Sequence, residues 1–282
     1  MHPPRLIVNG DDLGRSESNT RGIVEGYRRG IVTSTSMVAN GPRFDLAVAA
    51  ARENPGLGVG VHLALQEYPP VSDPRTIPSL VRDDGRFFSM GASFLRLLRG
   101  QARTAEVRRE WEAQVAKVVD HGIRPTHLDG HCHCHAHPAL AEVVVEVASR
   151  FRIPAARLPR EALGHLGRVA PTSARRYLEK VGLRWACRGA AAVWKDRLRF
   201  PQAFHGFMEG GRMSDRALAA VAASLRPGVA EVMVHPGVTD DDRPFDNGYR
   251  WTGDLAAVTR YTRAQFEERF SLRLVSYGEA WA

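Results

Sequence analysis

The sequence predicts a mostly parallel α/β fold and, within that class, a (β/α) barrel. Short apolar segments alternate with longer segments of helical periodicity along the whole chain. The chain has 282 residues, of which 44% are hydrophobic and 25% charged, enough for one large α/β domain with a buried core. Polar residues follow almost every expected strand, and the mouth of a (β/α) barrel is built from such strand ends.

The expected strands are short and rich in aliphatic residues. They cover Arg5–Asn9, Thr33–Val38, Leu57–Leu65, Thr126–Asp129, Ala155–Leu158, Ala230–His235 and Arg273–Ser276. The expected helices have apolar residues at spacings of three and four. They cover Ser18–Arg29, Arg43–Glu53, Ala105–His121, Pro138–Arg150, Ser214–Leu225 and Gly253–Phe270. Pro138 suits the first turn of its helix, because a missing N–H costs little there.

We expect a single domain over residues 1–282. Residues 69–104 and 159–213 lack the strand alternation, and we interpret them as insertions that shape the mouth of the barrel. No apolar run approaches the ~20 residues that span a bilayer, and residues 6–8 are too short for a signal peptide. Three cysteines are an odd number, so a disulfide framework is not expected. We therefore expect a cytoplasmic protein, with a peripheral position at the inner membrane surface left open.

Much of the net charge of +8 lies in residues 173–200, which hold eight basic and two acidic side chains. Apolar residues fall at helical spacing in the same segment, including Tyr177, Leu178, Val181 and Trp185. One interpretation is a solvated amphipathic helix, and another is a surface for anionic lipid or a lipid-linked substrate. Nucleic acid is not an expected partner, because no zinc finger or helix-turn-helix pattern is present. A homo-oligomer is left open.

The segment THLDGHCHCHAHP, residues 126–138, concentrates five of the eleven histidines and two of the three cysteines. If the chain is extended there, the odd-numbered residues share one face, and Cys132 and Cys134 point the other way. The polar face could then supply metal ligands or proton carriers, and the cysteines would pack inward. A structural zinc site is disfavoured, because Cys187 offers no second ligand pair. The residues of the polar face are His127, Asp129, His131, His133 and His135.

Three further strand ends offer groups that a hydrolytic metal centre needs. LIVNGDDLG ends a strand with Asp11 and Asp12, so that one carboxylate can bind a cation while the other remains a base. GVGVHLAL places His62 in an apolar strand, and EVMVHPG places His235 at a strand end. A single such histidine is more often a core residue than a ligand. An aspartate with two histidines is nevertheless a plausible set for a catalytic divalent metal.

These motifs, in this order and at this spacing, resemble the YdjC-like carbohydrate deacetylases, the family of chitooligosaccharide deacetylases. GIVTSTSMVANG, PTHLDGHCHCH, RLPRE and VSYGEA extend the match to nearly the whole chain. The resemblance implies a distorted TIM-like (β/α) barrel that acts on N-acetylated sugars with one divalent metal. The middle segment, through FPQAFHGFMEGGRMS, is more similar to the hopanoid-biosynthesis branch, although that branch commonly has Asn in place of Asp129.

The resemblance also implies roles for individual residues. Asp12, His62 and His131 would bind the metal, with zinc expected and magnesium, cobalt or nickel left open. Asp11 would be the general base and His235 the general acid. Arg157 would steady the carboxylate of the base. The histidines and the aspartate that remain in the polar segment would lie around the metal or in the substrate pocket: His127, Asp129, His133 and His135.

The implied reaction is hydrolysis of an acetamide to a free amine and acetate. No GxSxG motif is present, so a covalent acyl-enzyme is disfavoured. A metal-dependent phosphoesterase or amidohydrolase on the same barrel is one alternative. A sugar-binding barrel without catalysis is another, and it would have no need for a second carboxylate beside the metal.

Overall fold

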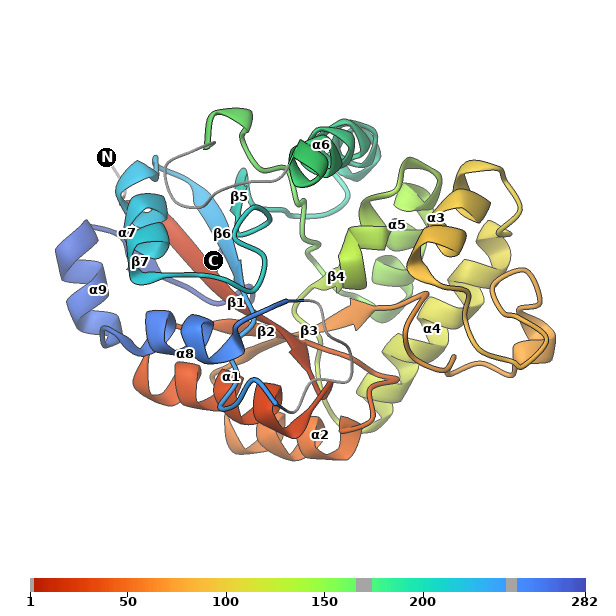
Figure 1. Cartoon of the computed structure of the whole chain (residues 1–282), viewed down its shortest axis with the longest axis horizontal. Coiled ribbons are helices and arrows are strands. Elements are labelled where there is room, and N and C mark those ends of the chain that lie inside the picture. The colour runs from red at the N-terminus through yellow and green to blue at the C-terminus, as the bar shows by residue number, and fades with distance from the viewer. Residues whose placement is uncertain (1–2, 166–173, 242–247) are drawn as a thin grey trace.

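The computed structural model describes residues 3–165, 174–241 and 248–282, which form a curled parallel sheet surrounded by helices (Figure 1). Six strands follow the order β4-β3-β2-β1-β6-β5, and β7 pairs with the start of β1. Every strand pair is parallel. The strands are β1 (Arg5–Leu13), β2 (Ser34–Met37), β3 (Gly58–Leu63), β4 (Leu128–Gly130), β5 (Ala203–His205), β6 (Val229–Val234) and β7 (Arg273–Leu274). The prediction of a mostly parallel α/β fold is confirmed.

Strand β1 lies in the middle of the sheet and contributes to two separate cores. Leu6 and Val8 pack in the large core that includes the helices, whereas Ile7 packs with Ala155 and Tyr277 in a smaller cluster. Successive side chains of a strand point to opposite faces, so Asn9 and Asp11 follow Ile7 on the inner face. The inner face of β1 thus changes from apolar to polar toward the carboxyl end of the strand.

The two edges of the curled sheet are linked through residues 155–161. Single parallel bridges join Leu128 of β4 to Ala156, and Glu161 to Phe204 of β5. A third bridge joins Ala155 to Arg199. The strand expected at Ala155–Leu158 therefore exists only as isolated bridges, and the barrel is distorted along this seam.

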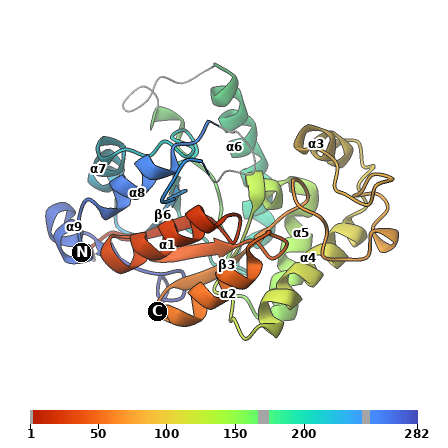
Figure 2. The same ribbon diagram turned by 60° about the horizontal axis from the view of Figure 1, so that its bottom comes forward.

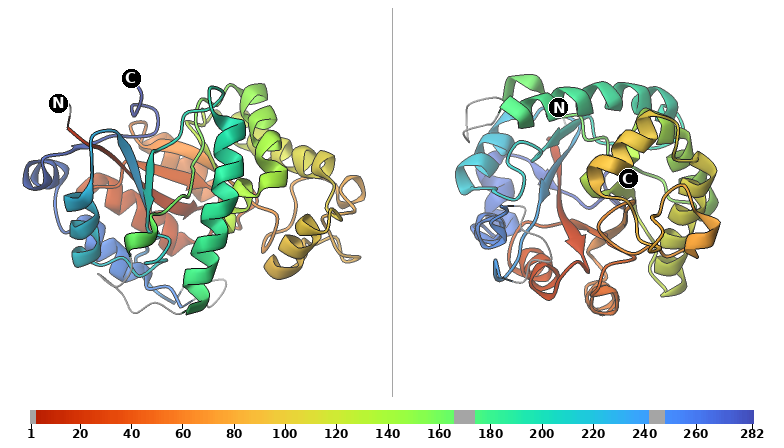
Figure 3. Two further views of the ribbon diagram at one scale, coloured as in Figure 1. Left: turned by 90° about the horizontal axis from the view of Figure 1, so that it is seen from above. Right: turned by 45° about the vertical axis from the view of Figure 1, so that its right-hand side comes forward.

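Helices cover the outside of the sheet in two groups of contacting neighbours. One group contains α2, α1, α8 and α7, and the other contains α4, α5 and α6. Figure 2 brings α1 and α2 to the front of the sheet, and Figure 3 shows α6 along the outside of the molecule. The helices are α1 (Glu17–Arg29), α2 (Phe44–Glu53), α3 (Met90–Leu98), α4 (Thr104–Asp120), α5 (Ala141–Phe151), α6 (Ala174–Trp194), α7 (Asp215–Ser224), α8 (Trp251–Thr259) and α9 (Arg263–Phe270), with short 3₁₀ turns at Pro74–Thr76, His131–Ala136, Pro138–Leu140 and Leu163–His165.

Three expected elements differ from the structure. The helix expected at Gly253–Phe270 is two helices, because Thr262 caps α9 through a reciprocal capping box with Gln265. Residues 159–213 were expected to lack strands, yet they contain β5, whose three residues are too few for a visible alternation. Pro138 opens a 3₁₀ turn that leads into α5.

Helix α6 does not bury the apolar stripe that the sequence suggested. Leu178 and Trp185 are exposed, whereas Lys180 is buried and pairs with Glu161 at 3.1 Å. Further along, the Trp194 indole is buried and donates to the Ala141 carbonyl at 2.9 Å. Among the described residues, no helix has the length and apolar character needed to cross a membrane.

Candidate active site

Asp11 and Asp12 lie in the last part of β1, where the strand departs from regular pairing. Its register with β2 shifts between Gly10 and Leu13, and Asp12 has a left-handed φ of 74°. Such irregularities are uncommon for residues that carry a Cβ, and they redirect side chains next to functional sites. The two carboxylates therefore have different partners: Arg157 contacts Asp11, and Arg15 contacts Asp12 at 2.8 Å.

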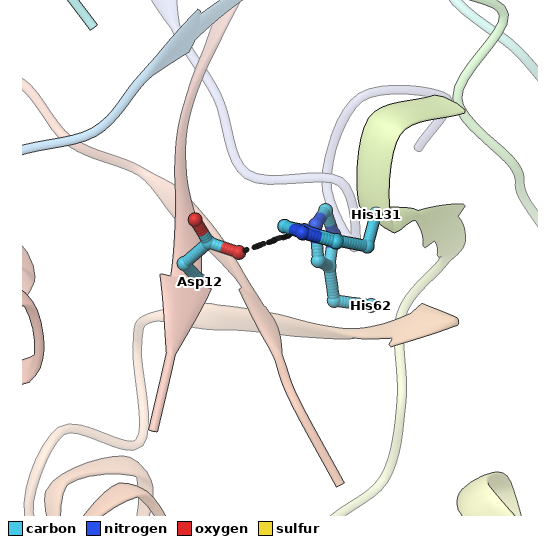
Figure 4. Close-up of side chains that lie close together, drawn as sticks. All are labelled: Asp12, His62 and His131. Atoms are coloured by element: carbon cyan, nitrogen blue, oxygen red, sulfur yellow. Dashed lines mark ion pairs between the residues drawn. The ribbon is translucent and has the colours of Figure 1, made fainter. Parts of the chain in front are cut away.

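Asp12, His62 and His131 converge on one position (Figure 4). The Asp12 Oδ1 atom lies 3.5 Å from His62 Nε2 and 3.3 Å from His131 Nδ1. All three side chains are buried, and this Oδ1 atom has no hydrogen-bond partner among the described residues. A buried carboxylate oxygen without a partner is costly, and a cation would satisfy it. The three residues thus fit a divalent metal.

Two other carboxylates orient the imidazoles of this group. His62 Nδ1 lies 2.8 Å from Asp129 Oδ1, and His131 Nε2 lies 2.8 Å from Glu67 Oε2. When these nitrogens carry the ring protons, His62 Nε2 and His131 Nδ1 present lone pairs toward Asp12. Carboxylates behind metal-binding histidines commonly fix the tautomer and the ring orientation in this way.

The charges around this position favour a cation. Burial alone would raise the pKa of Asp12, but Arg15 and the two histidines outweigh it and hold the pKa well below its usual value. Burial alone would lower the pKa of His62, but Asp129 outweighs it and the pKa is raised. The carboxylates therefore favour positive charge at this position, which a metal ion would supply.

Arg157 is fully buried and links the catalytic candidates on the inner face of the sheet. Its two terminal nitrogens contact the two oxygens of Asp11 at 2.6 and 2.7 Å. It also contacts Asp129 at 2.8 Å and Glu231 at 2.8 Å. Asn9 Nδ2 donates a further hydrogen bond to Asp11 at 2.8 Å. The Asp11 carboxylate is thereby fixed in place, with an oxygen within 4.8 Å of a His62 ring nitrogen.

Glu231 extends this network toward the C-terminal segment. Its second oxygen accepts a hydrogen bond from the Tyr277 hydroxyl at 2.7 Å. Burial raises the pKa of Glu231 to about 7, although Arg157 and Tyr277 act in the opposite direction. Glu231 is thus a buried acid that shares the Arg157 Nη2 atom with Asp11.

His235 follows β6 directly. Its backbone N–H donates to Asp254 at 2.8 Å, and its ring packs edge-on against Tyr249 at 4.9 Å. Its Nδ1 atom is buried without a partner among the described residues. Burial lowers the pKa of His235 to about 4, although Asp11 and Asp12 raise it. The imidazole is therefore neutral at pH 7.

The histidine-rich segment is extended only as far as Gly130. From His131 it forms a 3₁₀ turn in which Cys132 and His133 have left-handed φ values of 51° and 58°. The expected alternation of two faces beyond Gly130 is therefore wrong. The exposed position of Cys132 contradicts its expected burial, whereas Cys134 is half-buried, and its thiol lies 3.5 Å from the Leu63 carbonyl.

The other histidines of the segment separate into supporting positions. His127 stacks on Tyr277 with ring centroids 3.7 Å apart and lies 3.3 Å from Ser36 Oγ, which in turn donates to Asp129 at 2.7 Å. His135 Nε2 lies 2.9 Å from the Arg157 carbonyl oxygen.

His133 has aromatic neighbours instead of a polar network. Its ring centroid lies 5.7 Å from those of both Phe204 and Phe207. It also lies 6.5 Å from the ring of His135. His133 thus lies beside two phenylalanine rings.

Several residues that complete the site were not predicted from the sequence. Arg15 lies three residues beyond Asp12, and this short separation could have suggested the ion pair. Glu67 has a left-handed φ of 66°, and no local sequence motif predicts this backbone conformation. Asn9, Glu231 and Tyr277 belong to the site only through contacts that form in the folded chain: Asn9 contacts Asp11, Glu231 contacts Arg157, and Tyr277 contacts Glu231.

Comparison with known proteins gives a consistent result. The family model described as "YdjC-like protein" matches residues 5–268. A carbohydrate deacetylase of Geobacillus stearothermophilus is 31% identical over 98% of both chains. A carbohydrate deacetylase of Brevibacillus brevis is 42% identical over 53% of this chain, and that match spans 58% of the Brevibacillus protein.

A solved structure gives the same picture for the fold. The crystal structure of a putative cellobiose-phosphate cleavage protein of Enterococcus faecalis aligns with a TM-score of 0.77 at 25% identity, over 98% of both chains. The expected family resemblance is confirmed by the family model and by the full-length relative. The chain belongs to the YdjC-like family, whose matching curated members are named carbohydrate deacetylases.

Proposed function

We propose that the protein is a metal-dependent N-deacetylase. It would hydrolyse the acetamide of an N-acetylated amino sugar, in an oligosaccharide, glycolipid or glycoside, to a free amine and acetate. The observation that carries the proposal is the unpartnered Asp12 oxygen facing two carboxylate-oriented imidazoles, next to the separately held Asp11. The relatives named carbohydrate deacetylases support the substrate class.

Asp12, His62 and His131 would hold one divalent metal ion. Bound there, such an ion would polarise the acetyl carbonyl and favour ionisation of the attacking water. One carboxylate and two imidazoles suit zinc, which we propose, and they also accept magnesium, cobalt or nickel. Glu67 and Asp129 would keep the two ligand rings in the binding orientation.

Asp11 would take the proton from the attacking water. It has the geometry of a positioned base, because Arg157 holds both of its oxygens and Asn9 holds one. Because Asp11 is not one of the three proposed metal ligands, it could exchange a proton while the metal stays bound. A well-placed general base typically contributes about 10²–10⁴-fold to the rate.

His235 would give a proton to the departing amine, since an unprotonated amide nitrogen leaves very poorly. With a pKa of about 4, the ring is neutral at pH 7 before the reaction. We therefore propose that His235 gains its proton during turnover, from the proton that Asp11 has taken from water. This order returns both residues to their starting state after each cycle.

The residues around the ligands would have distinct supporting roles. Asp129 would position His62, and His127 would support Asp129 through Ser36. His135 would fix the backbone of Arg157. His133, set between aromatic rings, would contact the substrate.

Helix α6 presents a surface suited to a lipid headgroup region or a glycolipid. Leu178 and Trp185 are 69% and 67% exposed, and Val181 between them is 40% exposed. Arg175 and Arg188 of the same helix are also exposed. Apolar residues flanked by cations are typical of helices that lie on anionic membranes, so we propose this contact for α6. A cytoplasmic location stays a prediction.

A substrate panel tests the proposed function directly. Soluble N-acetylated oligosaccharides, N-acetylated glycolipids and N-acetylated aminoglycosides would be assayed for acetate release, alongside phosphate esters. The proposal predicts acetate release from at least one N-acetylated sugar, with loss of activity after chelation and recovery after zinc is restored. Release of phosphate alone, or sugar binding without acetate release, would contradict it.

A further inference from the structure

A second set of ligating atoms lies toward the solvent side of His131. Carboxylate, imidazole and thiol atoms from Glu67, His131 and Cys132 lie within 4.8 Å of one another. We propose that these residues form a second cation site, specific for thiophilic divalent ions such as zinc, cadmium or cobalt(II). Its occupant would compete with the ion held by Asp12, His62 and His131.

The local backbone presents these three side chains together. Glu67 and Cys132 both have left-handed φ values, 66° and 51°, which turn their side chains out of the regular chain direction. The Cys132 side chain is exposed and Glu67 is 26% exposed, whereas Asp12 and His62 are buried. An ion arriving from solvent would therefore meet the second set first.

The donor atoms determine which ions this site would accept. A thiolate and an imidazole favour zinc, cadmium and cobalt over magnesium or calcium, which prefer oxygen ligands. Binding would convert the Cys132 thiol into a metal thiolate and release its proton to the solvent, with no change in oxidation state. The Glu67 carboxylate would supply the third ligand.

Competition between the two sites follows from the two nitrogens of His131. Nδ1 faces Asp12 at 3.3 Å, and Nε2 faces Glu67 at 2.8 Å. A neutral imidazole has one free lone pair and one N–H. An ion bound at Nε2 would place the ring proton on Nδ1, which removes His131 from the inner ligand set. Excess zinc should therefore inhibit, and excess magnesium should not. This inhibition rests on the proposed function, but binding at the second site does not.

The test uses the metal-free full chain, titrated with cobalt(II) and with cadmium. Binding to Cys132 would give a thiolate-to-metal charge-transfer absorption in the wild type. The variant Cys132→Ser should lose this absorption. It should also bind the ion at the second site about 10-fold or more weakly, because even the loss of a residue that only hydrogen-bonds to a metal ligand typically weakens metal binding by that factor. The matched control Cys134→Ser should keep it, because the Cys134 thiol lies against the Leu63 carbonyl.

Two outcomes would overturn the proposal. One is a charge-transfer band that is absent from the wild type, and the other is a band that Cys132→Ser leaves unchanged. Acetate release is measured in the same samples. Chelator-sensitive release without the band would refute the second site and leave the deacetylase intact. The band without any acetate release would support the second site and count against the proposed function.

Discussion

Arg157 is the buried charge on which the polar residues of the inner face depend. It contacts Asp11, Asp129 and Glu231 at distances of 2.6 to 2.8 Å. Removing one partner from a buried ion pair typically costs about 3–5 kcal/mol, because the remaining charge is left without compensation. We expect Arg157→Met to lower the free energy of unfolding by an amount in this range, as measured by denaturant unfolding.

The matched control is Arg197→Met. Arg197 also forms a close pair, with Glu142 at 2.7 Å, but both side chains are exposed. Solvent-exposed pairs contribute little, so this variant should unfold nearly as the wild type does. If the two substitutions lowered the free energy of unfolding equally, burial of Arg157 would not be the cause of its contribution to stability.

The sequence predicted the location of some site residues but not of others. The strand-end motifs predicted that Asp12, His62 and His131 would meet at one mouth, because the carboxyl ends of parallel strands converge there. The choice of these three as metal ligands came from the family resemblance. Glu67 and Glu231 could not be predicted, since their roles depend on contacts between segments far apart in the chain. The orientation of Cys132 was missed because local parity assumes an extended backbone, which ends at Gly130.

At the scale of elements, helix α1 packs unusually closely on the loop that carries His235. A Cβ added at Gly22 would lie 2.5 Å from the backbone of Gly237, so the helix or the loop must move. We expect Gly22→Ala to destabilise the fold by about 1–3 kcal/mol, as measured by denaturant unfolding, despite the better helix propensity of alanine.

Gly182 provides the control for this substitution. It lies within α6, and an added Cβ would meet no atom within 4 Å. Gly182→Ala should therefore raise the free energy of unfolding by about 0.5–1 kcal/mol. If both substitutions shifted stability in the same direction, close packing at Gly22 would not be the controlling factor.

The exposed face of α6 gives a prediction on membrane contact. In vesicle flotation, the protein should bind vesicles that contain anionic phospholipid and should bind neutral phosphatidylcholine vesicles less. The double variant Leu178→Ser, Trp185→Ser should lose most of this binding, because it removes the exposed apolar groups. Unchanged flotation of the variant would assign the binding to charge alone, and no flotation of the wild type would refute the contact.

Most elements could be predicted from periodicity, but β5 and the break between α8 and α9 could not. Strands β1, β2, β3 and β6 carry enough aliphatic residues to be recognised within a few residues of their observed ends. β5 has three residues, and its pairing with β6 depends on long-range geometry. The break between α8 and α9 depends on the cap at Thr262, which a continuous helical pattern hides.

For the whole molecule, buried neutral histidines link stability to pH. Burial lowers the pKa of His127 to about 3, compared with about 6.5 in an unfolded chain. Above pH 6.5 the ring is neutral in both states. Between pH 6.5 and 3 only the unfolded state binds the proton, so this residue lowers the free energy of unfolding by about 1.4 kcal/mol per pH unit as the pH falls.

The variant His127→Gln isolates this effect. The difference in unfolding free energy, wild type minus variant, should decrease by about 1.4 kcal/mol per unit between pH 6 and pH 4. Urea unfolding at several pH values measures it, and all other titrating groups cancel in the difference. Two parallel stability curves would mean that His127 is not a buried neutral group.

The curled sheet brings together residues from β1, β3 and the turn after β4, and we propose that the adjacent carboxylates Asp11 and Asp12 have different roles there. The direct test measures bound metal and acetate release together in Asp12→Asn and Asp11→Asn. We predict that Asp12→Asn loses both, and that Asp11→Asn keeps its metal while turnover falls by about 10²–10⁴-fold. Metal-dependent turnover in Asp12→Asn, or a near wild-type rate in Asp11→Asn, would contradict the account.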